Sequence, residues 1–328
     1  MSGNHNQSLE RALAIVAAAC KAGAHAIKLQ TYTADAITID CRGGEFEITD
    51  ESSLWNGRNL YELYQAAGTP YEWHGPIFEH AKKLGIICFS TPFDEGAVDV
   101  LEGLNAPAYK VASFENNHHA LLKKIAGTGK PVVMSTGVSS ISEIDESVRV
   151  LRTNGCKDLV LLKCTSTYPA SPENTNLRTI PHLRQLYNCE VGLSDHTMGI
   201  GASVAAVALG ASVIEKHFCL SRAEGGVDSA FSIEPHELKL LVEESERAFL
   251  ALGAIQYGIQ NEELKSLVYK RSVYITEDMK AGDVLTAQNI RIIRPGLGLA
   301  PKYFDSVLGK KINKDVKRGT ALTFELIG

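Results

Sequence analysis

Short apolar, β-prone runs alternate with stretches of helical periodicity through most of this chain. Two such runs, at residues 190–193 and 212–214, flank a segment at 199–209 that is rich in Ala and Val at helical spacing. A strand, a helix and a second strand in this order form a parallel βαβ unit. Repetition of that unit is the feature that most limits the fold, because it requires a parallel sheet covered by helices.

The alternation can be counted along the chain. Seven strands are predicted, at residues 25–30, 86–90, 108–112, 132–135, 159–164, 191–194 and 213–216. Eight helices are predicted, at 8–22, 71–84, 94–103, 117–127, 139–152, 176–186, 199–209 and 235–251. A TIM barrel has eight of each, and the first helix is the one without a strand. The sequence therefore predicts an α/β protein with a (β/α)₈ TIM barrel whose first strand would precede Met1.

The pattern changes after residue 252. A partly polar connector at 253–268 is followed by short apolar runs punctuated by Gly, which indicate a small β-rich module. The predicted organisation is a barrel domain at 1–252, a linker at 253–268 and a module at 269–328. A module of about sixty residues has only a small hydrophobic core, so it is expected to gain stability by packing against a barrel.

Composition excludes several classes of protein. The formal net charge of −5 gives no electrostatic case for nucleic acid or an anionic membrane. No apolar run approaches the ~20 residues of a membrane span, and the N-terminus lacks the basic and apolar regions of a signal peptide. The seven cysteines are scattered without metal-type spacing. They are typical of reduced thiols, so a cytoplasmic protein is expected.

Two histidines, His196 and His217, follow neighbouring predicted strands at the end of the barrel where such folds carry their chemistry. Two imidazoles so placed could share one divalent metal ion. Ser194, Asp195 and Glu215 are close to them in the sequence and strengthen that interpretation. The alternative is that each histidine only makes a structural hydrogen bond.

Lys28 and Lys110 also lie in predicted strands near their carboxyl ends. Burial of an ammonium group is costly unless an anion pairs with it. Several strands end in hydroxyl-bearing residues, and Gly137 would let backbone N–H groups approach an anion. These residues predict a phosphate site, unless the lysines simply extend outward to solvent.

Nine short motifs occur along the chain, at residues 3–7, 27–32, 89–93, 109–115, 134–137, 163–169, 192–197, 215–218 and 294–298. Together they resemble the sialic acid synthase family. The resemblance covers nearly the whole chain and is specific because many short motifs occur in the same order. It implies a phosphoenolpyruvate-condensing barrel joined to an antifreeze-like SAF domain of the β-clip type.

Residues 54–64 and 69–74 are similar to the pseudaminic branch of that family, and residues 228–232 support this branch more weakly. The similarity implies condensation of phosphoenolpyruvate with 2,4-diacetamido-2,4,6-trideoxy-L-altrose. The products would be phosphate and pseudaminic acid, a nonulosonic acid used on surface glycans or flagellin. N-acetylneuraminate or legionaminic acid synthesis is the alternative within the family.

The resemblance also implies roles for single residues. His196 and His217 would bind a divalent metal ion, with Mn²⁺ preferred to Mg²⁺ or Co²⁺. The same two histidines would be catalytic together with Glu115 and Glu215. Arg294 would reach the sugar in the barrel of the other subunit of a domain-swapped homodimer. The family's usual glutamate on the first strand would precede Met1. The remaining substrate-binding residues would be Lys28, Gln30, Thr91, Lys110, Ser113, Ser135, Tyr168 and Ser194.

Two other functions remain open. Lys163 on a predicted strand could be the nucleophile of a Schiff-base aldolase, although that chemistry has no need for two histidines. The chain could also be an inactive binding or assembly subunit. Separately, Trp55, Tyr61 and Tyr64 lie in an insertion outside the barrel repeat, so we predict that they form a lid over the substrate. The alternative is an apolar patch covering the barrel rim.

Overall fold

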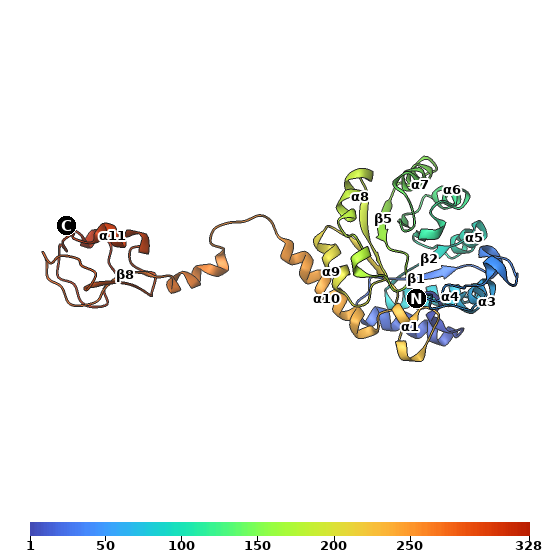
Figure 1. Cartoon of the computed structure of the whole chain (residues 1–328), viewed down its shortest axis with the longest axis horizontal. Helices are drawn as coiled ribbons and strands as arrows, with labels where there is room; N and C mark the ends of the chain where they lie inside the picture. The colour runs from blue at the N-terminus through green and yellow to red at the C-terminus, as the bar shows by residue number, and fades with distance from the viewer. The chain divides into compact units, whose positions relative to one another are not determined.

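The computed structural model describes all 328 residues and contains two compact units, Met1–Gly253 and Ala254–Gly328. The larger unit contains a sheet of seven parallel strands. Figure 1 shows that this sheet is curled and enclosed by helices. The strands pair in chain order from β1 to β7, each with the next. The predicted α/β barrel architecture is therefore confirmed.

Each predicted strand and helix of the barrel is present. The strands are β1 Ala26–Thr31, β2 Ile87–Pro92, β3 Tyr109–Val111, β4 Val132–Ser135, β5 Leu159–Cys164, β6 Glu190–Asp195 and β7 Val213–Lys216. The main helices are α1 Leu9–Lys21, α4 Tyr71–Leu84, α5 Glu95–Gly103, α6 His119–Gly127, α7 Ile141–Thr153, α8 Thr179–Tyr187, α9 Gly201–Ala208 and α10 Pro235–Leu252. The insertion before α4 contains α2 Ala34–Ile37 and α3 Leu60–Ala67.

Side chains on β6 and β7 alternate between the inside of the curled sheet and the surrounding helices. Ser194 is paired in register with Glu215, and both face inward, as their mutual hydrogen bond shows. The next pair, Asp195 and Lys216, faces outward and forms a nearly fully buried ion pair of 2.9 Å. Ser203 of α9 donates to the same carboxylate at 2.6 Å. Asp195 was expected to lie beside the histidines. Its side chain instead links β6 to α9.

Gly192 allows β6 and β7 to approach each other. A Cβ atom at this position would overlap the carbonyl oxygen of Val213 and crowd Leu162. Any larger residue would push apart the two strands that end at His196 and His217. The absence of a side chain here thus places the two strand ends next to each other.

The N-terminal segment lies between the two edges of the curled sheet. No pairing joins β1 to β7. The amino group of Met1 donates to the carbonyl of Lys28 on β1 at 3.0 Å, and Asn4 Nδ2 donates to the carbonyl of Phe218 just after β7 at 3.0 Å. The buried 3₁₀ turn Ser2–His5 therefore bridges these edges. The predicted strand before Met1 stays a prediction.

The smaller unit has its own hydrophobic core. Its strands β8 Ser272–Ile275 and β9 Ile290–Ile293 pair antiparallel, and isolated bridges connect the surrounding turns. Val273, Leu285 and Leu322 are fully buried at its centre. It contains one short helix, α11 Phe304–Val307, and the 3₁₀ segment Asn261–Tyr269 precedes it. The β-rich character predicted for this part of the chain is confirmed.

The longest helix, α10, packs mainly on α9 and closes the larger unit. A capping box at Glu234 and Glu237 satisfies its first backbone N–H groups. Its length and apolar content do not suffice to cross a bilayer, and the same is true of every other helix in the protein.

Candidate active site

A cluster of buried charges lies inside the curled sheet where the strands end. Glu215 Oε1 is 3.1 Å from Lys110 Nζ, and Glu215 Oε2 is 3.4 Å from Lys28 Nζ. Ser194 Oγ also donates to Glu215 Oε1 at 2.9 Å. The side chain of Lys110 is only 2% exposed. One carboxylate from β7 thus connects lysines from β1 and β3.

The electrostatics of this cluster favour an added anion. Burial acts to raise the pKa of Glu215, but the charges of Lys110 and Lys28 and the hydrogen bond from Ser194 hold that pKa well below its usual range. Burial lowers the pKa of Lys28, and the charge of Glu215 acts in the opposite direction. Two ammonium groups share one carboxylate, so the charged cluster retains an excess of positive charge.

Predicted hydroxyl residues surround the lysines. Lys110 Nζ donates to Ser135 Oγ at 2.6 Å. Thr91 Oγ1 is buried and has no hydrogen-bond partner, which is costly unless a ligand supplies one. The N–H of Gly137 donates to Ser113 Oγ at 3.1 Å, so this amide is used within the protein. A Cβ atom at Gly137 would collide with Ser113 and Ser166, and close packing explains the glycine.

Glu115 follows β3 in a short 3₁₀ turn. Burial raises the pKa of its carboxyl to about 7, although the charge of Lys110 acts to lower it. Its Oε2 atom is buried without a hydrogen-bond partner. A carboxyl of this kind can exchange a proton near neutral pH, as a general acid or base must.

His196 and His217 lie side by side, with ring centroids 5.3 Å apart. His196 Nδ1 donates to the carbonyl of Thr165 at 2.9 Å. His217 Nδ1 is 3.2 Å from Ser2 Oγ and 3.7 Å from Asp228 Oδ2. Because oxygen atoms engage both Nδ1 atoms, each ring keeps Nε2 for a metal, which is the usual arrangement of histidine ligands.

The protonation state of His217 also fits a ligand role. Burial and the neighbouring charges of His196 and Lys28 lower the pKa of His217 well below its usual value. A neutral imidazole is the form that binds a metal. Tyr168 packs against this pair, with its ring centroid 4.5 Å from His196 and 6.3 Å from His217.

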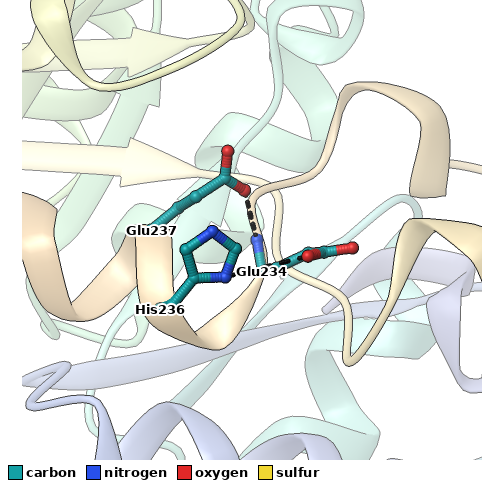
Figure 2. A group of neighbouring side chains, drawn as sticks. All are labelled: Glu234, His236 and Glu237. Carbon is teal, nitrogen blue, oxygen red and sulfur yellow. Dashed lines mark hydrogen bonds and ion pairs between the residues drawn. The ribbon is translucent and has the colours of Figure 1, made fainter.

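A second group of possible metal ligands occurs at the start of α10. Figure 2 shows Glu234, His236 and Glu237, whose ligand atoms lie within 4.8 Å of one another. Glu237 Oε2 accepts from the backbone N–H of Glu234 at 2.8 Å and pairs with Arg222. Glu234 Oε1 accepts from the N–H of Arg222 at 2.8 Å. These contacts explain the cluster as a helix cap, so we assign it no metal.

Some predicted residues lie outside this cluster of contacts. Gln30 is on the same face of β1 as Lys28 but makes no polar contact of its own with the charged residues. Arg294 belongs to the smaller unit, so its predicted role stays a prediction.

Lys163, the proposed aldolase nucleophile, points away from the charged cluster. Its Nζ donates to the carbonyl of Cys164 at 2.8 Å and to Thr165 Oγ1 at 3.0 Å. It lines a cavity of about 370 Å³ with side chains of α7 and α8, among them Ile144 and His182. None of the predicted substrate-binding residues lines this cavity.

The predicted aromatic lid divides into two parts. Trp55 packs on Tyr168, with ring centroids 5.8 Å apart, and so joins the histidine pair. Tyr61 and Tyr64 instead line a separate cavity of about 420 Å³. The hydroxyl of Tyr61 donates to Asp35 at 3.2 Å on the surface. Only Trp55 of the three is therefore in contact with the predicted site.

Four further residues join the site without having been predicted for it. Asp228 comes from a loop after β7, Phe231 packs on both histidines, and Cys164 Sγ lies 3.9 Å from His196 Nδ1. Asn116 donates to Ser139 Oγ at 2.6 Å behind the hydroxyl residues. These residue types are common in loops and cores. The resemblance motif at 163–169 includes Cys164, and residues 228–232, which support the pseudaminic branch, include Asp228 and Phe231. No sequence signal points to Asn116.

Comparison with known proteins identifies the family. A model of the NeuB family matches residues 15–257, about three quarters of the chain. The chain belongs to the NeuB family. A SAF-domain model matches residues 270–327 of the same chain. The resemblance to the sialic acid synthases, inferred from scattered motifs, is thereby confirmed for this NeuB-family enzyme.

Individual relatives refine this result. A pseudaminic acid synthase from Campylobacter jejuni is 45% identical over 98% of this NeuB-family chain and 93% of its own length. An N,N'-diacetyllegionaminic acid synthase from the same strain is 34% identical over 96% of this chain and 94% of its own. An N-acetylneuraminic acid synthetase structure from Leptospira borgpetersenii superposes with a TM-score of 0.70 at 31% identity, covering 81% of this chain and 88% of that one.

The raised pKa of Glu115 predicts a pH-dependent stability. The carboxyl has a pKa of about 7 in the folded protein, against an ordinary value of 4.5 for glutamate. Between these values the folded state binds more protons, so stability falls as the pH rises through this window. Glu115→Gln should remove that loss. The difference between variant and wild type in free energy of unfolding should grow by ~2–3 kcal/mol from pH 5 to pH 8 in urea titrations.

Glu51→Gln provides the control, because Glu51 is exposed in the insertion. Its effect should be the same at both pH values. A constant difference for Glu115→Gln as well would mean that its carboxyl ionises as an ordinary surface glutamate does.

Proposed function

We propose that this NeuB-family enzyme condenses phosphoenolpyruvate with 2,4-diacetamido-2,4,6-trideoxy-L-altrose to give pseudaminic acid and phosphate. The observation that carries the proposal is the 45% identity to a pseudaminic acid synthase over nearly the whole of both chains. The lower identity of 34% to the legionaminic enzyme of the same strain favours the L-altro sugar. All seven cysteines are free thiols, which supports a reducing, cytoplasmic setting.

Phosphoenolpyruvate would bind in the charged cluster. Its phosphate and carboxylate are anions, and Lys28 and Lys110 supply the positive charge that Glu215 only partly neutralises. The unpartnered hydroxyl of Thr91 would gain an acceptor from the ligand. Ser113, Ser135 and Ser194 would add further hydroxyls around the same position. Fixed charges and donors of this kind orient the enol and stabilise the leaving phosphate.

The histidine pair would hold a divalent metal. Neutral imidazoles with free Nε2 atoms suit Mn²⁺ or a related ion, with water or substrate oxygen at the remaining positions. When bound, the metal would supply Lewis-acid polarisation of the sugar's aldehyde oxygen. Nδ1 contacts to Thr165 and Ser2 keep both rings oriented for that role.

Residues of the chain would guide the remaining steps. Carbon 3 of phosphoenolpyruvate attacks the aldehyde carbon, water adds to carbon 2, and the resulting tetrahedral intermediate releases phosphate. Glu115 is the best candidate to accept a proton from that water, because its pKa of about 7 leaves it partly ionised at neutral pH. Glu215, held ionised by its two lysines, would keep them in place as the phosphate leaves.

The competing functions have less support. A Schiff-base aldolase would need its lysine beside the substrate, whereas Lys163 lies in a cavity between β5 and the outer helices. An inactive subunit would have no reason to keep unpartnered, buried polar atoms at Thr91 and Glu115. N-acetylneuraminate or legionaminic acid synthesis remains the nearest alternative and differs only in the acceptor sugar.

Metal binding predicts the behaviour of three histidine variants. His196→Ala and His217→Ala should each lower Mn²⁺ affinity by more than about 100-fold and abolish phosphate release, because a ligand of a small set is lost. His236→Ala, in the helix cap of Figure 2, should change neither property. Electron paramagnetic resonance of free Mn²⁺ measures the affinity, and circular dichroism checks the fold. Unchanged affinity in both site variants would remove the metal assignment.

Acceptor preference tests the proposed reaction itself. The purified protein should release phosphate from phosphoenolpyruvate with the L-altro diacetamido sugar at a kcat/KM at least ~100-fold above that with N-acetylmannosamine. The reason is that the two sugars differ at carbons 4 and 6 and in configuration. Equal values for both sugars would leave the family assignment intact and refute the pseudaminic substrate.

We also propose that the working unit is a homodimer in which Arg294 of each chain completes the site of the other. Its guanidinium presents a rigid set of donors suited to the hydroxyl and amide oxygens of a sugar. Arg294 lies just after β9 and directly before Pro295 and Gly296 in the SAF unit. The alternative is an arginine that serves only a local contact.

Subunit complementation tests this arrangement. Arg294→Ala and His217→Ala should each be inactive alone, because one lacks the sugar contact and the other lacks a metal ligand. After the two are denatured and refolded together, part of the activity should return, since some mixed dimers pair an intact barrel with an intact module. If no mixture recovers activity, each site is built within one chain.

A further inference from the structure

Three aromatic rings adjoin the histidine pair, and together the five rings form one continuous group. Phe231 lies 4.9 Å from His217 and 5.1 Å from Tyr168, measured between ring centroids. Trp55 lies 5.8 Å from Tyr168 and 6.4 Å from Phe231. The metal-binding end of this group is polar, whereas its other end, formed by Trp55, is apolar. We call Trp55, Tyr168 and Phe231 the aromatic wall.

Trp55 is held in this position from a distant part of the chain. Its Nε1 donates to the carbonyl of Val227 at 2.9 Å, immediately before Asp228. The insertion that carries Trp55 is thereby fixed to the loop that supports His217 through Asp228. Since the polar atom of the indole is engaged there, the rest of the ring presents only carbon atoms.

The three members of the wall differ in how they can meet a ligand. Phe231 is only 2% exposed, so it supports the others from behind. Tyr168 and Trp55 are both partly exposed. Tyr168 packs directly on His196, and Trp55 stands one ring farther from the histidines. A sugar whose aldehyde carbon faces the histidines would therefore reach Trp55 with its far end.

We propose that Trp55 is a specificity-determining residue that recognises the deoxygenated, methyl-bearing end of the acceptor sugar. This inference rests on the proposed function, because it assumes a 2,4-diacetamido-2,4,6-trideoxyhexose whose aldehyde lies at the histidine pair. The methyl group at carbon 6 and the nearby acetamido methyl pack on the indole face.

The chemistry of the wall explains why such a surface discriminates. A methyl group gains dispersion contacts and loses apolar hydration when it packs on an indole ring. A hydroxyl at carbon 6, as in N-acetylmannosamine, would lose hydrogen bonds to water and find no partner on the indole face. One apolar group in a pocket changes kcat/KM by roughly 10–200-fold. The aromatic wall therefore favours a sugar that lacks the hydroxyl at carbon 6, and it does not act on the reacting end of the sugar.

Steady-state kinetics test the inference. Trp55→Ala should lower kcat/KM for the diacetamido sugar by about 10–100-fold, chiefly through KM, and leave KM for phosphoenolpyruvate within about twofold. The same variant should lose little with N-acetylmannosamine, so the preference between the sugars collapses. Trp55→Phe should restore part of the loss, because it keeps an apolar ring but lacks the bond to Val227. Leu54→Ala, at the exposed neighbouring residue, is the control and should behave as wild type.

A binding measurement separates this inference from the proposed function. The chain has two tryptophans, and Trp73 packs on His5 in another part of the barrel. Trp73→Phe therefore leaves Trp55 as the only source of tryptophan fluorescence. Adding the diacetamido sugar without phosphoenolpyruvate should change Trp55 emission, whether or not turnover follows. The wild-type enzyme could convert this sugar while the sugar leaves Trp55 emission unchanged and Trp55→Ala leaves the kinetics unchanged. That result would overturn the inference about Trp55 and leave the proposed function intact. If the wild-type enzyme does not convert the sugar, the proposed function is refuted instead. In that case a change in Trp55 emission on adding the sugar supports the inference, and unchanged emission refutes it.

Discussion

The interaction on which the site depends is the sharing of Glu215 between Lys28 and Lys110. Two ammonium groups buried inside a barrel would each carry a large desolvation penalty, and one carboxylate offsets only part of it. The remaining positive charge makes the interior suited to an anion with two negative groups. Ser135 and Ser194 form hydrogen bonds with members of this cluster, and the hydroxyl of Thr91 on β2 is buried without a hydrogen-bond partner.

Strand alternation distributes the polar residues between chemistry and stability. Ser194 and Glu215 face the interior, whereas their immediate neighbours Asp195 and Lys216 form a buried ion pair toward α9. Lys163 faces the outer helices in the same way. Consecutive residues on a strand point to opposite faces, so motifs that look uniform in the sequence serve two purposes. The outward pair joins β6 and β7, the strands whose inward residues Ser194 and Glu215 belong to the charged cluster.

Segments outside the barrel repeat complete the site. The N-terminal turn contacts His217 through Ser2, and the loop after β7 adds Asp228 and Phe231. The insertion contributes Trp55, which the backbone of Val227 anchors. The contacts made by Ser2 and Trp55 join residues more than 150 positions apart. The strands thus carry the charged cluster, whereas the aromatic side chains beside the histidines include residues of loops, which vary more readily than strands do.

The sequence by itself determined the order of strands and helices, the two-part organisation and most of the polar residues at the strand ends. Those features are local, because periodicity and turn residues depend on near neighbours. Only the tertiary structure decided that Asp195 and Lys163 face away from the site, that Tyr61 and Tyr64 line another cavity, and that Trp55 joins the histidines. Face and partner depend on strand register and loop packing, which bring distant residues together and leave no local pattern.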